Sequence, residues 1–509
     1  MPKKISNVFL SRTILVSLLI LLQIILLSSS MIFLSFKAYL FSLLLRGTSL
    51  LVVAWINSKN DNPSYKLSWI ILILTAPLVG GVFYLLWGNK RLPNGLRKRM
   101  DELYRANPAH IQTKNNCSEE LAAIDPQLAI QSAYITRTTA FPVCKNTANE
   151  HFPLGDIAYT RLLEELQKAE RFIFLEYFII SPGLMWDSIV EILKAKKQIG
   201  LEIKIMFDDI GSINTLPKNY ADTLQAMGLE CTVFNPFMPH LNVSMNYRDH
   251  RKICIIDGNV AFCGGINLAD EYINRKCRFG HWKDSVVMLR GEGVWNLTLM
   301  FLNLWKFANP QQTLDYPRYI PTVSAESDGY VQPFGDSPLD HYNVAQTVYL
   351  QMINRATDYV YLTTPYLVLD NETITALSSA AQSGVDVRII TPHIPDKWYV
   401  HRVSRSFYSV LIQSGVRIFE YTPGFMHAKQ MVCDDKIAVV GTTNLDFRSF
   451  YLHFECGVSF YYSSVVSQVK QDILSTLSVC REMTCNALKK LPLRQRLFAV
   501  VLRIFAPLI

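Results

Sequence analysis

The chain is 509 residues long, more than one ordinary domain requires, and half of its residues are apolar, a share that is high for a soluble enzyme and suits a protein with membrane segments. Its net charge of +8 fits an anionic partner, either a nucleic acid or an anionic lipid surface. The ten cysteines include no C-x-x-C pair, which argues against a zinc site or a disulfide framework and predicts reduced thiols in a protein that faces the cytosol.

Three apolar segments lie in the first ninety residues, so we expect residues 1–90 to form a membrane anchor with two or three transmembrane helices. Thr13–Phe36 carries no charge, and Leu67–Trp87 has about the twenty residues that a bilayer requires. Ala38–Ile56 is ambiguous because Arg46 lies near its middle, and an arginine at mid-bilayer costs about 2.5–3.5 kcal/mol. A cleaved signal peptide is the alternative for the first segment, although no A-x-A site follows it.

A cationic flank follows the third apolar segment and sets the expected orientation. Its residues are Lys90, Arg91, Arg97, Lys98 and Arg99. Because cytoplasmic flanks are enriched in Lys and Arg, we expect the rest of the chain to lie on the cytoplasmic side. Residues 91–137 are polar and charged and indicate a linker, whereas residues 489–509 predict an amphipathic helix that lies on a membrane or packs on the protein itself.

The body of the chain reads as an internal repeat of strand, helix and strand. The segments are 169–180, 186–197 and 202–207 in the first half, and 356–368, 373–383 and 385–390 in the second. Strands that alternate with helices predict parallel α/β layers with the helices outside. The stretch Asp315–Pro338 is rich in Pro, Gly, Ser and Asp, so we place the domain boundary there and predict domains over residues 138–318 and 319–488.

Each half carries one copy of the pattern H-x-K-x-x-x-x-D, with an Asn seventeen residues after the His. The residues are His250, Lys252, Asp257 and Asn267 in the first copy, and His427, Lys429, Asp434 and Asn444 in the second. Each copy opens an apolar run that a short turn joins to a second apolar run, which predicts a β-hairpin. Because strand side chains alternate, the His and Lys of one copy share a face.

The expected turns are Gly258-Asn259 and Asp435-Lys436, both plausible two-residue hairpin loops. The resulting register places each motif His opposite the Asn of its own copy. It also places Lys252 opposite Gly265 and Lys429 opposite Thr442.

An imidazole, an ammonium and an amide on one face suit a phosphodiester substrate. A neutral His is a nucleophile or general base, and its protonated form is a general acid. Lys and Asn donate hydrogen bonds to phosphate oxygens. Displacement through a covalent intermediate needs a nucleophile on one side of the phosphorus and an acid on the other, so we expect both histidines to converge on one cleft.

The accessory candidates are less specific. Asn267, Asn444 and Thr442 are the candidate phosphate-binding residues. Asp257 and Asp434 end their strands at the turn, where they either fix the loop or contact substrate. The two lysines supply the positive charge that a metal would bring, so we expect no metal and no other cofactor.

The paired motifs resemble those of the phospholipase D superfamily, and the surrounding sequence resembles the bacterial cardiolipin synthases. The stretches that carry this resemblance are NPSYKLSWIILILTAPLVGGVFYLLWGNKR, HRKICIIDGNVAFCGGINLADEY and MHAKQMVCDDKIAVVGTTNLDFRS. The resemblance implies two pseudo-symmetric phospholipase D-like α/β/α domains, preceded by N-terminal transmembrane helices, on the cytoplasmic side of a bacterial inner membrane.

The resemblance also implies an activity. One motif histidine, His250 by preference, attacks the phosphorus of a phosphatidylglycerol to form a phosphatidyl-histidine. The other protonates the departing glycerol and then activates a hydroxyl of a second phosphatidylglycerol, which gives cardiolipin. The implied catalytic set is His250, Lys252, Asp257, His427, Lys429 and Asp434. The implied partners are these anionic phospholipids and the membrane, with no nucleic acid.

Glu455, 28 residues after His427, stands where the superfamily has an acid that orients a motif histidine. In the first half that offset falls on Arg278, and the nearest acid, Asp284, fits only with an insertion. Other reactions of the superfamily stay open: a phospholipase D, a phosphatidyltransferase with another acceptor, or a membrane-tethered nuclease. A nuclease should carry a basic groove interleaved with aromatic residues, and no such run lies near the motifs.

Overall fold

The structure is a computed structural model that describes residues 36–88, 94–110, 116–236, 246–326, 329–340, 342–489 and 493–508. The chain divides into two compact units. The larger unit comprises Pro93–Met238 and Met245–Arg503, and the smaller comprises Met1–Leu92, Pro239–Ser244 and Ile504–Ile509.

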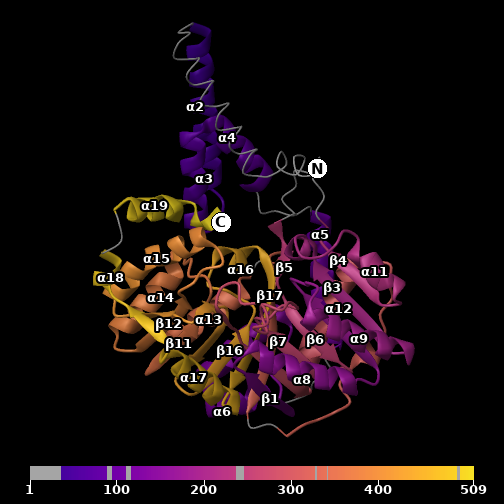
Figure 1. Ribbon diagram of the computed structural model, residues 1–509. Coiled ribbons are helices and arrows are strands. Elements are labelled where there is room, and N and C mark those ends of the chain that lie inside the picture. Colours follow the sequence, from indigo (N-terminus) through magenta and orange to yellow (C-terminus); the bar gives the residue numbers. More distant parts are fainter. Residues whose placement is uncertain are drawn as a thin grey trace. The chain divides into compact units, whose positions relative to one another are not determined.

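The first half of the larger unit is built on a seven-stranded mixed sheet with the strand order β1-β9-β7-β6-β2-β3-β4 (Figure 1). β2, β3 and β4 run parallel, and the other neighbours pair antiparallel. The strands are β1 (Thr147–Phe152), β2 (Phe172–Tyr177), β3 (Glu202–Asp208), β4 (Glu230–Phe234), β6 (Lys252–Ile256), β7 (Val260–Gly264) and β9 (Val286–Gly291).

The second half repeats this order as β10-β17-β16-β15-β11-β12-β13, with β18 added beyond β13. The strands are β10 (Tyr330–Asp336), β11 (Tyr359–Thr363), β12 (Asp386–Pro392), β13 (Arg417–Tyr421), β15 (Gln430–Cys433), β16 (Ile437–Gly441), β17 (His453–Tyr461) and β18 (Cys480–Met483). The prediction of a repeated α/β architecture is therefore confirmed, whereas the expectation of parallel layers is wrong: in each half three strands run parallel, and the motif hairpin and its neighbours pair antiparallel.

Helices pack around both sheets of the larger unit (Figure 1). Those of the predicted linker and the first half are α5 (Asn94–His110), α6 (Cys117–Ile124), α7 (Pro126–Thr139), α8 (Gly155–Lys168), α9 (Leu184–Gln198), α10 (Asp209–Ser212), α11 (Tyr220–Ala226) and α12 (Val294–Ala308). Those of the second half are α13 (Val344–Arg355), α14 (Asn371–Gln382), α15 (Trp398–Gln413), α16 (Phe447–Tyr451), α17 (Ser464–Leu477), α18 (Cys485–Lys489) and α19 (Leu493–Ile504).

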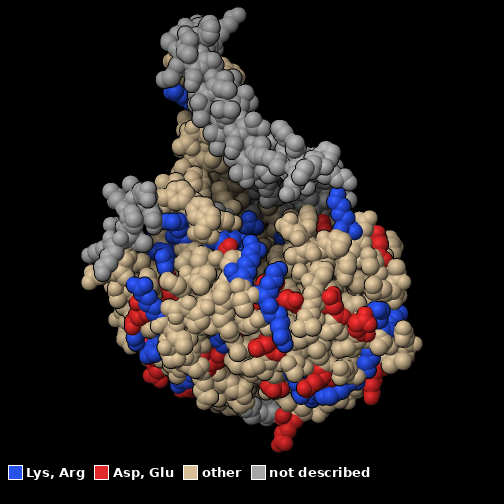
Figure 2. All heavy atoms as spheres, viewed as in Figure 1, with Lys and Arg blue, Asp and Glu red and all other residues tan. Residues whose placement is uncertain are grey.

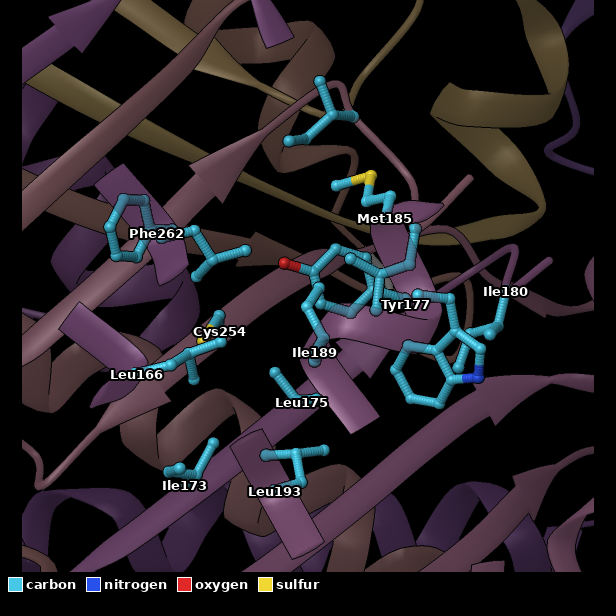
Figure 3. Close-up of a cluster of buried hydrophobic side chains, with 14 of the residues drawn as sticks. Leu166, Ile173, Leu175, Tyr177, Ile180, Met185, Ile189, Leu193, Cys254 and Phe262 are labelled. Atoms are coloured by element: carbon cyan, nitrogen blue, oxygen red, sulfur yellow. The ribbon is translucent and has the colours of Figure 1, made fainter. Parts of the chain in front are cut away.

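The core of the first half forms where β2 meets its helices (Figure 3). Ile173, Leu175 and Tyr177 alternate along β2 and lie on one face, packed among residues of α9 such as Ile189 and Leu193. The intervening residues of β2 are buried as well, so this strand is apolar on both faces apart from one carboxylate, Glu176.

Helix α12 is apolar on all sides, as expected of a helix that protein encloses. Every residue from Val294 to Trp305 is buried. The ring of Phe301 stacks on Phe174 of β2, with centroids 4.7 Å apart. On the second half, the amide of Asn296 donates to the carbonyl of Pro333 in β10 at 3.2 Å. The helix therefore joins the two sheets.

The two motif hairpins have three-residue turns, so the predicted two-residue loops and their register are wrong by one position. Ile256 pairs with Val260, and Cys433 pairs with Ile437. The aspartates that were expected to end the strands have φ values of 57° at Asp257 and 51° at Asp434, and this left-handed conformation takes them out of the ladder. One consequence is that Lys429 lies opposite Gly441, whose N–H donates to the Lys429 carbonyl at 3.1 Å, and not opposite Thr442.

The described residues of the smaller unit contain one helix that is long and apolar enough to cross a membrane, within α2 (Phe36–Asn57). Its leucines are largely exposed, with Leu44 at 65% and Leu51 at 73%. The segment with the ambiguous Arg46 is thus the long apolar helix. The first predicted segment, Thr13–Phe36, lies outside the described residues except for Phe36.

The predicted span Leu67–Trp87 is not one continuous helix, which corrects the expectation. It is divided among α3 (Pro63–Thr75), α4 (Pro77–Phe83) and a π-helix (Tyr84–Gly88). Ala76, the residue before Pro77, has φ −137° and ψ 72°. A residue that precedes a proline avoids helical geometry, so the helix ends there. α4 then packs closely on α3, since a Cβ at Gly80 would lie 2.6 Å from the carbonyl oxygen of Leu72.

The C-terminal helix α19 packs on α15 through aromatic and cationic side chains. The ring of Phe498 stacks on Trp398 with centroids 6.1 Å apart, and the guanidinium of Arg503 lies 4.2 Å from the Phe407 ring. Val500 and Val501 remain exposed. The helix thus contacts the protein and still presents apolar side chains outward.

Candidate active site

Each motif histidine is held against the opposite half of the larger unit. The backbone N–H of His250, in the first half, donates to the carbonyl of Phe454 in β17 at 2.9 Å. The N–H of His427, in the second half, donates to the carbonyl of Lys283 at 2.7 Å. The short strands β5 (Arg248–Asp249) and β14 (Gly424–Met426), which lead into the motifs, pair in parallel with β17 and with β8 (His281–Lys283).

The residue after each of these carbonyls is an acid that binds the histidine across the boundary between the halves. The carboxylate of Glu455 lies 3.0 Å from Nδ1 of His250, and that of Asp284 lies 2.6 Å from Nδ1 of His427. Both carboxylates are fully buried. Each half therefore supplies the acid for the other half's histidine, and neither half holds a complete site.

The sequence identified Glu455 as an orienting acid but not the histidine that it binds. It left Asp284 doubtful because the two acids follow their motif histidines at different distances along the chain. The acid follows the motif His by 34 residues in the first half and by 28 in the second. The available signal was a short strand directly before each acid, His281–Lys283 before Asp284 and the start of β17 before Glu455.

The charges of the two motifs act on one another. Burial lowers the pKa of His427 to about 4, and the charges of Lys429 and, from the other half, Lys252 contribute. Burial also lowers the pKa of Lys429 to about 7; Asp284 opposes this shift, and Lys252 adds to it. The motifs thus share one electrostatic site, and the described sheets place β7 and β17 side by side there (Figure 1), with the sulfurs of Cys263 and Cys456 3.5 Å apart.

Both imidazoles are neutral near pH 7. Burial lowers the pKa of His250 to about 3, and the opposing charge of Glu455 does not compensate. The pKa of Glu455 and of Asp284 lies below the ordinary carboxyl range despite burial, because each accepts from a histidine. Each Nδ1–H therefore donates to a carboxylate, which leaves the lone pair on Nε2.

The lysines of the two motifs act on one another electrostatically, and each is bound within its own motif. Nζ of Lys252 donates to the carbonyl of His250 at 2.5 Å, and Nζ of Lys429 donates to that of His427 at 2.6 Å. Burial lowers the pKa of Lys252 to about 8. An anionic phosphate between these lysines would raise both of their pKa values, and the charged lysines would in turn bind the phosphate more tightly.

The predicted phosphate-binding residues are engaged differently. Asn267 is bound within the protein: its Nδ2 donates to the Tyr272 hydroxyl at 2.5 Å, and its Oδ1 accepts from the N–H of Ile179 at 3.0 Å. The Thr442 hydroxyl donates to Glu455, so it supports the acid rather than pointing a free donor at substrate. Asn444 has a buried Oδ1 with no hydrogen-bond partner among the described residues.

Asp257 and Asp434, predicted among the catalytic residues, bind backbone instead. The carboxylate of Asp257 accepts from three successive N–H groups, Glu170 to Phe172, at 2.7–3.0 Å. That of Asp434 accepts from the N–H groups of Thr357 to Tyr359 at 2.7–3.0 Å. Each aspartate fastens its hairpin turn to the start of β2 or β11, which favours the loop-fixing alternative over contact with substrate.

A third histidine, His453, lies at the site and was not found from the sequence. Its ring centroid is 5.3 Å from that of His250, and Phe178 contacts both rings. The available signal was its position two residues before Glu455 on a strand, because that spacing places both side chains on one face.

Comparison with known proteins agrees with this geometry. The family model described as "Cardiolipin synthase, PLD-like domain" matches residues 162–278 and 349–477, and the model "Phospholipase_D-nuclease N-terminal" matches residues 48–89. An "uncharacterized protein" of Streptococcus mutans is 42% identical, covering 90% of this chain and 99% of its own. The cardiolipin synthase of Alkalihalophilus pseudofirmus is 33% identical, covering 89% and 90%.

Among solved structures, phosphatidylserine synthase from Haemophilus influenzae has a similar fold, with a TM-score of 0.57, 14% identity, and coverage of 74% of this chain and 97% of its own. This likeness concerns the fold alone, whereas the sequence identities extend over nearly the whole chain. The chain, with its two motif hairpins and exchanged acids, belongs to the phospholipase D-like cardiolipin synthase family.

Proposed function

We propose that the protein is a membrane-bound cardiolipin synthase that transfers a phosphatidyl group from one phosphatidylglycerol to another. The single observation that carries this proposal is the exchange of acids, in which Glu455 holds His250 and Asp284 holds His427. Two oriented neutral imidazoles in one electrostatic site suit a double displacement at phosphorus. The similarity to proteins named cardiolipin synthase supports phosphatidylglycerol as the substrate.

In this proposal Nε2 of His250 attacks the phosphorus, a P–N bond forms, and the P–O bond to glycerol breaks. His427, protonated when substrate is bound, gives its proton to the departing glycerol. The now neutral His427 takes the proton of a hydroxyl on the second phosphatidylglycerol, whose oxygen displaces His250. The products are cardiolipin and glycerol. The roles of the two histidines follow the family preference, because the pseudo-symmetry does not distinguish them.

Lys252 and Lys429 bind the non-bridging oxygens, with Asn444 beside them. Charge develops on these oxygens in the transition state, and cations that are already positioned stabilise it without reorganisation. Transfer to a lipid hydroxyl rather than to water requires a dry site. The small exposure of His250 and His427, 8% and 7%, supports this requirement.

We propose that the N-terminal region anchors the enzyme in the membrane with the catalytic unit on the cytoplasmic side. The exposed apolar surface of α2 and the cationic residues that follow Trp87 support this arrangement. A multi-pass anchor would use the segment Thr13–Phe36 together with α2, which also keeps Lys3 and Lys4 on the cytoplasmic side.

Incubation of the full-length enzyme with phosphatidylglycerol as the only lipid tests the function. We expect cardiolipin and glycerol in equal amounts, and neither product from His250→Ala or His427→Ala. Phosphatidic acid as the main product would instead identify a phospholipase D. The face of the protein in Figure 2 carries acidic and basic side chains interspersed rather than one basic surface, which favours a lipid substrate over a nucleic acid.

A further inference from the structure

The imidazole of His453 has no role in the proposed reaction, although it lies beside the nucleophile. Its Nδ1 is 3.8 Å from Oε1 of Glu455, too far for a hydrogen bond. This nitrogen is buried and has no hydrogen-bond partner among the described residues, although it lies within ion-pair distance of Glu455. A buried polar atom without a partner is costly, so the position suits an additional ligand.

Three residues meet at this point: His250, His453 and Glu455 each offer one ligand atom, and these atoms all lie within 4.8 Å of one another. Oε1 of Glu455 is 3.0 Å from the first nitrogen and 3.8 Å from the second. In a tetrahedral zinc site with bonds of about 2.0–2.2 Å, ligand atoms are about 3.4 Å apart. The two separations bracket that value, so small side-chain rotations suffice.

The surroundings of the trio suit zinc in particular. Two imidazoles and one carboxylate are a ligand set that zinc accepts with a fourth position open. The Thr442 hydroxyl holds Oε2 of Glu455, which fixes Oε1 toward the two rings. His250 and Glu455 are already in contact through Nδ1 and Oε1 at 3.0 Å, so both ligand atoms face the same point.

A second group of two histidines and a glutamate shows what the trio lacks. Glu420 lies 2.9 Å from Nδ1 of His393 and 3.7 Å from Nε2 of His401. There the guanidinium of Arg405 donates to both carboxylate oxygens, at 2.8 and 2.7 Å. That fixed cation occupies the acid and repels a metal ion, whereas no arginine binds the carboxylate of Glu455 among the described contacts.

We propose that His250, His453 and Glu455 form a zinc-binding site through which zinc reversibly inhibits the enzyme; the inhibition, unlike the binding, rests on the proposed function of His250. The bound ion would take Nδ1 of His250, and the proton that Nδ1 now donates to Glu455 would move to Nε2 through solvent. Nε2 would then carry a proton and lack the lone pair that attacks phosphorus. Lys252 and Lys429 both interact with the charge of Glu455, so these cations limit the affinity of the site for a metal ion.

Cobalt binding tests the site independently of activity. Full-length protein in detergent is titrated with Co²⁺, and the visible absorption of a tetrahedral Co²⁺ centre is recorded before and after addition of Zn²⁺. We expect this absorption for the wild type and for the control His393→Phe, and its displacement by zinc. His453→Phe, which keeps a ring against Phe178, and His453→Asn should abolish it. Unchanged spectra in both His453 variants would overturn the site.

Inhibition is measured on phosphatidylglycerol vesicles with increasing Zn²⁺, with EDTA added to test reversal. The activity of each His453 variant without metal is measured first and serves as its own baseline. Their zinc concentration for half inhibition should rise at least about tenfold, since even an outer-shell partner is worth that much. Wild type and His453 variants inhibited at the same zinc concentration would refute the proposal. Cobalt binding without zinc inhibition would retain the site and refute the regulation, and an inactive protein that binds cobalt would count against the proposed function alone.

Discussion

At the scale of single residues, the site depends on two acids that are distant from their histidines in the chain. Glu455 and Asp284 each fix the ring orientation and the tautomer of an imidazole from the other half. A carboxylate in this position also stabilises the imidazolium that forms during proton transfer. Removal of its charge should therefore affect chemistry far more than folding.

The amide variants test this role. Glu455→Gln and Asp284→Asn keep the side-chain shape but favour the wrong tautomer, so we expect kcat to fall by about 10²–10⁴-fold. Glu482→Gln is the control, because that acid is exposed and pairs with Arg417 far from the motifs. Steady-state cardiolipin formation and thermal unfolding should be measured together. Wild-type kcat in either amide variant would contradict the role.

The two motif lysines predict the pH dependence. Burial lowers the pKa of Lys429 to about 7 and of Lys252 to about 8, so the free enzyme loses its phosphate-binding cations as pH rises through this range. We expect kcat/KM to fall above pH 7–8, whereas kcat should hold to higher pH because bound phosphate raises both pKa values. Profiles of kcat/KM and kcat that fall together would contradict this.

The same groups affect stability in a defined direction. The folded pKa of each lysine lies below its unfolded value, so the unfolded state binds more protons between about pH 7 and 10.5, and this contribution makes stability rise with pH there. The folded pKa values of His250 and His427 also lie below their unfolded value of 6.5. Their contribution to the free energy of unfolding is therefore lost as pH falls from 6.5 toward 4. The cluster is thus maintained for function at a cost in stability.

At the scale of elements, the motif hairpins are fixed by their turns. Asp257 and Asp434 adopt positive φ, leave the strands and accept three backbone N–H groups each. These bonds attach the hairpin to the first strand of its half and so set the depth of the His and Lys that precede it. The aspartates of the motif pattern therefore act through the backbone.

Substitution at the turn should separate this structural role from a catalytic one. Asp434→Ala leaves three N–H groups without their acceptor, so we expect a loss of about 1–3 kcal/mol in the free energy of unfolding. The folded fraction should keep a kcat within a few fold of wild type. Chemical denaturation and active-site titration measure the two effects. A loss of kcat comparable to that of His427→Ala, in a protein of normal stability, would restore the catalytic role.

At the scale of the whole larger unit, Arg251 connects the halves behind the site. From its position between two motif residues, its Nε donates to the carbonyl of Glu455 at 3.2 Å. Its Nη1 lies 3.8 Å from Glu176 of β2, and its Nη2 donates to the Tyr104 hydroxyl at 3.3 Å. One fully buried guanidinium thus joins α5, the first sheet and the second.

Loss of this cation should therefore destabilise both halves. Arg251→Met removes the donors to the Glu455 carbonyl and to the Tyr104 hydroxyl, and a buried acceptor left unsatisfied costs about 1–3 kcal/mol. Hydrogen exchange should show faster exchange in β2 and in β17 alike. Arg290→Met is the control, because that arginine is partly exposed and pairs with Glu165 at the edge of the first half. Destabilisation confined to β2 would show that the halves are not coupled through Arg251.

The sequence by itself determined the repeat, the α/β class, the two motifs and the family, because strand and helix periodicity and the H-x-K spacing are local. It also placed Lys252 on its hairpin, whereas His250, His427 and Lys429 lie in the segments directly before the hairpin strands. These properties depend on neighbours a few residues apart, which a sequence shows directly.

The tertiary structure alone decided the rest. Asp284 and His453 entered the site through pairing between residues about 140–200 positions from their partners, and no local pattern encodes such pairing. The register shifted by one because two aspartates adopted a left-handed conformation that their hydrogen bonds to the backbone stabilise. The apolar run Leu67–Trp87 broke at Pro77 because α4 could pack on α3 across Gly80. Long-range contacts set these features, because each of these residues contacts a different element from the one on which it lies.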